Sequence, residues 1–175
     1  MKRHLGVWGF TLALAVYGTR TDALAASQQH GELLWQKAYV GMTAQKIQAL
    51  YPSVARSEGS QSESSHTLLS DKNYMIDDCK TELSFEFDHN ALMAVSIELL
   101  DKGNMTCQSS LHGSVNAKYG PPTSITFPRG IRSESWSRKG GVTIEVLGGS
   151  FPSINEYQIS ILYYKTGNKK MENSL

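Results

Sequence analysis

The segment that decides the fold of this chain runs Val40-Gly41-Met42-Thr43-Ala44-Gln45-Lys46-Ile47-Gln48-Ala49-Leu50-Tyr51-Pro52. It carries the start and stop signals of one short helix. The hydroxyl of Thr43 can cap the first turn, and Pro52 cannot continue the helix. Because Ile47, Leu50 and Tyr51 fall at i, i+3 and i+4, we predict that all three share its buried face.

A second helical segment has a similar ending. It opens at Cys107, places Leu111, Val115 and Tyr119 at i, i+4 and i+8, and is ended by a glycine and two prolines. Tyr119 lies 68 positions after Tyr51, and at this offset the ends of the two helices align while their starts differ. The alignment suggests that one structural unit occurs twice.

Strand periodicity follows each helix. After the first, apolar and polar residues alternate over 82–87 and 93–99, on either side of a turn at 88–90. The predicted core residues of this hairpin are Leu83, Phe85, Phe87, Met93, Val95, Ile97 and Leu99. After the second helix, strands are predicted at 133–138, 142–146 and 157–163. Each run has one apolar side, so we predict an α+β fold: an antiparallel sheet with two helices packed on one face, built as a duplicated helix-then-strands unit.

The first 25 residues resemble an export signal. A basic pair, Lys2 and Arg3, precedes an apolar run over 5–17, and Ala23-Leu24-Ala25 has the small residues of a cleavage site. The run is shorter than the roughly 20 residues that span a bilayer. We therefore predict three parts: a cleaved signal peptide at 1–25, a single domain at 26–164, and a flexible tail at 165–175. The mature protein is expected to be periplasmic or secreted, without stable membrane insertion.

The chain has two cysteines, Cys79 and Cys107, which are 28 positions apart. In an exported protein, such a pair is expected to form a disulfide. A reactive or metal-binding thiol pair is the alternative, but the Cys-x-x-Cys spacing typical of those sites is missing.

Neither the charge nor the motifs of the chain indicate catalysis. The net charge changes from +1 to −1 when residues 1–25 are removed, which argues against a nucleic-acid partner. The chain has no serine-hydrolase elbow, zinc-binding His-Glu-x-x-His helix or phosphate-binding loop. Asp77-Asp78 is interpreted as a solvated turn. The histidines are scattered at His30, His66, His89 and His112, so we expect no catalytic residue, metal site or cofactor.

The Gly41-Met42-Thr43 helix start, the helix face that follows, the Leu-x-Phe-x-Phe-Asp hairpin and the duplicated unit resemble one superfamily. It contains the beta-lactamase inhibitory proteins and the small outer-membrane-assembly lipoproteins. The chain differs from the lipoproteins in having no cysteine directly after the signal, and from the inhibitory proteins in having a single Gly-Met-Thr start. The resemblance implies a non-catalytic exported protein that works by binding another protein.

The expected function is therefore binding of an envelope or secreted protein, as an inhibitor-like or envelope-assembly accessory module. A small-ligand carrier with a cavity between sheet and helices is the alternative, and an enzyme is the third reading. If the residues from Tyr157 to Tyr163 alternate toward the core, Leu162 and Tyr164 lie on the water-facing side as candidate protein-binding residues. Trp136 is a weaker candidate because its face is not fixed, and the polar loop 57–65 is the next place to look.

Overall fold

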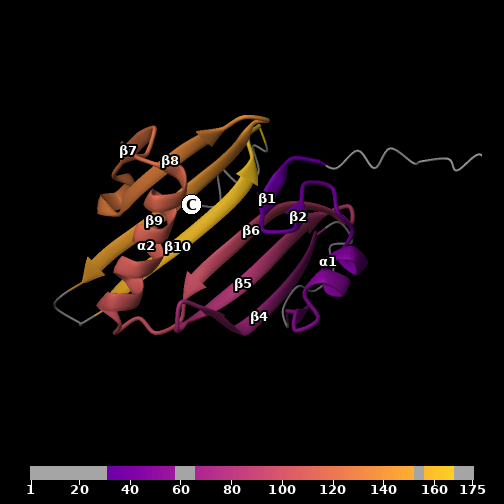
Figure 1. Ribbon diagram of the computed structural model, residues 1–175, viewed down its shortest axis with the longest axis horizontal. Coiled ribbons are helices and arrows are strands. Elements are labelled where there is room, and N and C mark those ends of the chain that lie inside the picture. Colours follow the sequence, from indigo (N-terminus) through magenta and orange to yellow (C-terminus); the bar gives the residue numbers. More distant parts are fainter. Residues whose placement is uncertain (1–30, 58–65, 152–155, 168–175) are drawn as a thin grey trace, which may run out of the picture.

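The computed structural model describes residues 31–57, 66–151 and 156–167 (Figure 1). The N-terminal half contains β1 (Leu33–Trp35), β2 (Ala38–Tyr39), α1 (Ala44–Leu50), β3 (Ala55–Arg56), β4 (His66–Ile76), β5 (Cys79–Asp88) and β6 (Ala91–Leu99). The C-terminal half contains α2 (Met105–Tyr119), β7 (Ser124–Thr126), a 3₁₀ turn (Pro128–Gly130), β8 (Arg132–Arg138), β9 (Val142–Phe151) and β10 (Glu156–Lys165). The predicted signal peptide and most of the loop 57–65 lie outside the described residues.

The sheet consists of two four-stranded meanders joined along their last strands. Its order is β3-β4-β5-β6-β10-β9-β8-β7, and every neighbouring pair is antiparallel. Each half therefore reads as one helix followed by four strands, and β6 meets β10 at the centre. The predicted α+β fold with a duplicated unit is confirmed. No bounds were predicted for the short strands β3 and β7, or for β4, which has 11 residues.

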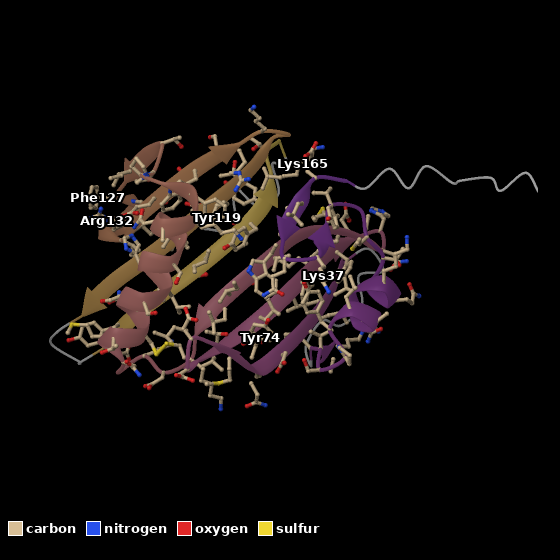
Figure 2. The ribbon with its side chains drawn as sticks, viewed as in Figure 1. Lys37, Tyr74, Tyr119, Phe127, Arg132 and Lys165 are labelled. Atoms are coloured by element: carbon tan, nitrogen blue, oxygen red, sulfur yellow. A yellow bond between two sulfur atoms is a disulfide. The ribbon has the colours of Figure 1, made fainter. Side chains whose placement is uncertain are left out.

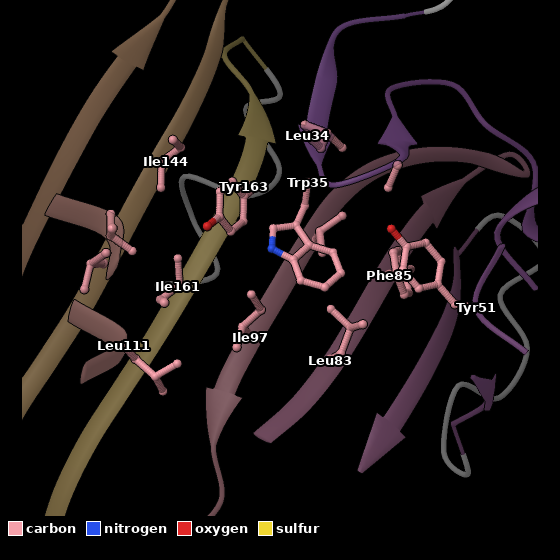
Figure 3. Close-up of a cluster of buried hydrophobic side chains, with 14 of the residues drawn as sticks. Leu34, Trp35, Tyr51, Leu83, Phe85, Ile97, Leu111, Ile144, Ile161 and Tyr163 are labelled. Carbon is pink, nitrogen blue, oxygen red and sulfur yellow. The ribbon is translucent and has the colours of Figure 1, made fainter. Parts of the chain in front are cut away.

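Both helices cover the same face of the sheet. Figure 1 shows α2 crossing over β9 and β10, while the β1–β2 hairpin and α1 lie over the half formed by β4, β5 and β6. Trp35, at the end of β1, projects into the middle of the core, in the region between Tyr163 and Phe85 (Figure 3). Its ring stacks on Tyr51 with 5.9 Å between centroids. The N-terminal hairpin thus packs beside the first helix and also covers the junction of the two halves.

The first helix is capped as predicted, but its buried face is narrower. The hydroxyl of Thr43 accepts from the amide of Lys46, and Ile47 and Tyr51 are buried. Leu50, however, is 41% exposed, so its assignment to the buried face was wrong. The ring of Tyr51 packs between Trp35 and Phe85 and draws the i+4 side of the helix toward the sheet, which leaves the i+3 side at the edge of the contact.

The β5–β6 hairpin has the predicted turn but contains a bulge. His89 and Asn90 both have positive φ, as a two-residue hairpin turn requires. Between Glu86 and Phe87 the register shifts, so that Phe87 pairs with Leu92. The extra residue puts Leu92 in the core, where the alternation had predicted Met93.

The C-terminal strand extends past the predicted domain end at 164. Lys165 pairs with Val142, and the amide of Thr166 donates to the carbonyl of Gly141. The Thr166 hydroxyl also contacts that of Thr143 at 2.7 Å. Residues 165–167 therefore belong to the folded unit. The rest of the predicted tail lies outside the described residues.

Cys79 and Cys107 form the predicted disulfide. Cys79 opens β5, and Cys107 lies in the first turn of α2, whose N-cap is the side chain of Asn104. The bond therefore links the sheet of the first half to the helix of the second.

Candidate functional site

The open face of the sheet, opposite the helices, carries two of the three predicted binding residues. Leu162 pairs in register with Ser96 and Glu145, on the side opposite the buried Ile161 and Tyr163. This confirms the strand faces predicted from alternation. Leu162 is nevertheless only 8% exposed, because Ala94 and Tyr164 pack against it. Tyr164 is partly exposed and so offers more accessible surface than Leu162.

Trp136 lies in the core beneath the second helix. Its side chain is buried on the helix-covered face of β8, and its indole nitrogen donates to the carbonyl of Gly120 at 2.9 Å. The bond ties β8 to the end of α2. Trp136 therefore offers no surface to a partner in this structure.

Small hydroxyl side chains and carboxylates dominate the open face. One row across the sheet pairs Ser70 with Ser84, Ser84 with Ser96, Ser96 with Leu162, Leu162 with Glu145, Glu145 with Ser135, and Ser135 with Ser124. Four glutamates face this side: Glu82, Glu86, Glu98 and Glu145. Apolar side chains are a minority here, centred on Leu162 and Tyr164.

Carboxylates are gathered on the open face of the sheet, which also carries Lys80 on the same side of β5 as Glu82. Glu82 and Glu98 stand directly opposite each other on β5 and β6, and within the described part of the chain neither forms an ion pair. Like charges directly opposite on neighbouring strands are destabilising. Of the basic residues of β8, Arg132 pairs with Glu134 and Arg138 lies over the ring of Tyr119, both on the helix-covered face. The open face is thus acidic at its centre.

A charged cluster around one buried carboxylate lies on the opposite, helix-covered face. Glu134 of β8 has a side chain only 2% exposed, and its carboxylate bonds two cationic or titratable groups. His112 Nε2 on α2 lies 2.9 Å from Oε2, and Arg132 Nε donates to Oε1 at 2.5 Å. Asn116, one turn after His112 on α2, contacts the imidazole Nδ1 at 3.3 Å. If the Asn116 amide donates there, Nε2 carries the imidazole proton and donates to Glu134.

The electrostatics of Glu134 follow from these partners. Burial alone would raise the pKa of the Glu134 carboxyl, but the hydrogen bonds and charges of His112 and Arg132 outweigh it and lower the pKa below its ordinary value. The carboxylate is therefore ionised, and its charge is balanced by Arg132. The cluster joins α2 to β8 through a polar contact inside an otherwise apolar layer.

A pocket of about 430 Å³ opens beside this cluster, between α2 and the sheet. Its walls are Gln108 and His112 of α2, the Ile131-Arg132 segment and Glu134, and the apolar side chains of Val146 and Ile159. Figure 2 shows Arg132 beside α2. The side chain of Phe127, just before the 3₁₀ turn, is 65% exposed. The pocket is the cavity between sheet and helix that the carrier hypothesis requires.

Sequence reasoning missed this cluster, although one signal was present. Arg132, Glu134 and Trp136 alternate on one strand, so a predicted buried Trp136 would have placed two charged residues on the core side. A charged residue in such a place needs a partner. The histidine that serves as this partner depends on how α2 packs on the sheet, and no local sequence pattern reveals how α2 packs.

Among residues 31–57, 66–151 and 156–167, no three His, Cys, Asp or Glu side chains are grouped closely enough to hold a metal ion. No helix in these ranges has the length and apolar character needed to cross a membrane. No protein-family profile, curated protein or solved structure matches this chain.

Proposed function

We propose that this chain is an exported, non-catalytic module that binds another envelope or secreted protein through the open face of its sheet. The partner surface is basic, and Tyr164 is an apolar anchor within the contact. The observation that carries the proposal is the directly opposed pair of Glu82 and Glu98 on that face.

A basic partner surface would complement the carboxylates of the open face. Opposed carboxylates cost stability in the free protein, whereas a lysine- or arginine-rich partner would turn the same charges into attraction. A partner would also cover the small apolar area formed by Ala94, Leu162 and Tyr164. Aromatic anchors surrounded by polar groups are typical of binding hot spots.

Export is supported by two features. Residues 1–25 have the pattern of a cleaved signal peptide. The Cys79–Cys107 disulfide is of a kind that persists in oxidising compartments such as the periplasm or the extracellular medium.

The resemblance to the beta-lactamase inhibitory proteins and assembly lipoproteins supports the same function. Two helix-then-four-strand units forming one continuous sheet are consistent with the duplication that the resemblance implies. The resemblance names no target, so the partner is identified here only by its charge.

Affinity capture with the mature, disulfide-bonded protein tests the proposal. The bait is incubated with the envelope and secreted fractions of the source cell, and captured proteins are identified by mass spectrometry. We expect a basic partner that binds wild type and is lost with Glu98→Lys, because that change reverses one charge of the pair. The control is Gln45→Lys/Gln48→Lys, which adds the same charge on the exposed side of α1. If both variants lose the partner equally, the contact depends on the net charge of the protein and not on the open face. If both variants still capture the partner, the binding site lies elsewhere.

One observation favours a second function, carriage of a small ligand. The pocket beneath α2 is within the range of about 300 to 1,000 Å³ that small-molecule sites occupy, and it combines apolar walls with few polar groups. Native mass spectrometry of the protein purified without denaturation would detect a retained ligand as an added mass.

A further inference from the structure

We infer that the pocket beneath α2 binds a monocarboxylate with an apolar body, its carboxylate on Arg132 and its body against Val146 and Ile159. The inference deepens the second proposed function, ligand carriage, by naming the class of ligand and the residue that selects it. It is independent of the open face, which lies on the other side of the sheet.

The first support is a glycine that keeps the pocket open. Gly148 follows Val146 on the core-facing side of β9 and pairs with Arg132 and Ile159. A Cβ built there would meet only the carbonyl oxygen of Gln158, at 3.7 Å, which is ordinary contact. A side chain would therefore fit and would project into the pocket. Glycine inside a strand weakens it and often marks a place where a ligand approaches closely.

The second support is the chemistry of the pocket wall. The pocket is open to solvent on one side and has a volume of about 430 Å³, enough for a small molecule. The walls are apolar where Val146 and Ile159 line them, and polar at the mouth, where half of the Arg132 side chain is exposed. A ligand that matches both parts has an apolar body and a polar head.

Arg132 is held in position to receive that head. Its Nε donates to the buried carboxylate of Glu134, which fixes the plane of the guanidinium and leaves the two Nη groups for a ligand. A carboxylate can accept from such a fork with two parallel hydrogen bonds. Because Glu134 already balances the charge of Arg132, its carboxylate repels a singly charged head less than a doubly charged phosphate.

The experiment compares octanoate with 1-octanol, which share the apolar chain and differ in the head. Binding to the folded, disulfide-bonded protein is measured by titration calorimetry at neutral pH. We expect octanoate to bind about 10- to 100-fold more tightly, the ratio that one charge-assisted hydrogen bond supplies. Equal affinities would overturn the carboxylate assignment and leave ligand carriage standing. If neither octanoate nor 1-octanol binds, both the carboxylate assignment and the proposed ligand carriage are overturned.

Two variants locate the binding. Gly148→Val should abolish octanoate binding while the melting temperature holds or rises, because the new side chain fills the void. Gly113→Ala, on the exposed side of α2 with no atom near its Cβ position, is the matched control and should bind as wild type does. Arg132→Lys, which keeps the charge without the fork, should weaken the preference for octanoate over octanol. Unchanged binding in Gly148→Val would place the octanoate site outside this pocket, and an unchanged preference in Arg132→Lys would overturn the role of Arg132.

Discussion

Tyr51 and Tyr119 occupy equivalent places in the two halves of the molecule. Tyr51 directly follows α1 and packs on Phe85 of the sheet, with 4.9 Å between ring centroids. Tyr119 is the last residue of α2 and hydrogen-bonds Tyr163 of β10, whose pKa is raised first by burial and then by this neighbour. Each tyrosine therefore fixes the end of its helix to the sheet. The 68-residue offset seen in the sequence corresponds to this shared role.

The exposure of Leu50 gives a prediction about stability. Ile47→Ala should lower the free energy of unfolding by about 2 to 4 kcal/mol, because Ile47 is fully buried against the sheet. Leu50→Ala should cost less than about 1 kcal/mol, since much of that side chain is already in water. Chemical denaturation of the two variants measures the difference. Lys46→Ala, at an exposed position of the same helix, is the control. Equal losses at Ile47 and Leu50 would contradict the docking of α1 described above.

The disulfide should contribute substantially to stability. The double variant Cys79→Ala/Cys107→Ala should lose about 3 to 4 kcal/mol, the value expected for closing a loop of this length. Urea denaturation with and without reductant measures it. Reductant should destabilise the wild type and leave the double variant unchanged. Labelling of both cysteines in denatured, unreduced protein would refute the bond.

The Glu134 cluster should make stability depend on acid pH. The pKa of Glu134 lies below its ordinary 4.5, so the carboxylate stabilises the fold fully above that pH. As the pH falls through the lowered pKa, this stabilisation is lost. Glu134→Gln should therefore be less stable than wild type at neutral pH and should lose less further stability between about pH 5 and pH 2. Denaturation curves across this pH range measure how the free energy of unfolding of each protein changes with pH. The same change in both proteins would contradict an ionised Glu134 carboxylate.

Glu98→Lys should raise stability while it weakens partner binding. It replaces the opposed pair of Glu82 and Glu98 with opposite charges, which favours the sheet by roughly 0.2 to 1 kcal/mol. The melting temperature of the free protein should rise slightly, and the rise should shrink at high salt because exposed charges are screened. A fall in melting temperature at low salt would mean that the two carboxylates do not repel each other.

Local patterns predicted the strands and both helices because their apolar faces follow simple periods. They failed where one packing contact shifts a period. The ring of Tyr51 moved the buried side of α1 away from Leu50, and the bulge at Phe87 replaced Met93 by Leu92 in the core. The Glu134 cluster was not predicted for a different reason. Arg132 lies on the same strand, but His112 comes from a helix whose position on the sheet no local pattern specifies.

The edges of the sheet have a consequence for self-association. The sheet ends in strands of two and three residues, β3 and β7. Where β4 runs beyond β3, the pairing is irregular between Asp71 and Tyr74, and the carboxylate of Asp71 accepts from the amide of Asn73. At the other edge, the hydroxyl of Thr123 accepts from the amide of Ser137.

Side chains thus occupy backbone donors that a foreign strand would need, and short or bulged edges are known to discourage such pairing. The folded protein should remain monomeric at concentrations where open eight-stranded sheets with regular edges would polymerise. Any aggregation on heating should then begin from the unfolded chain.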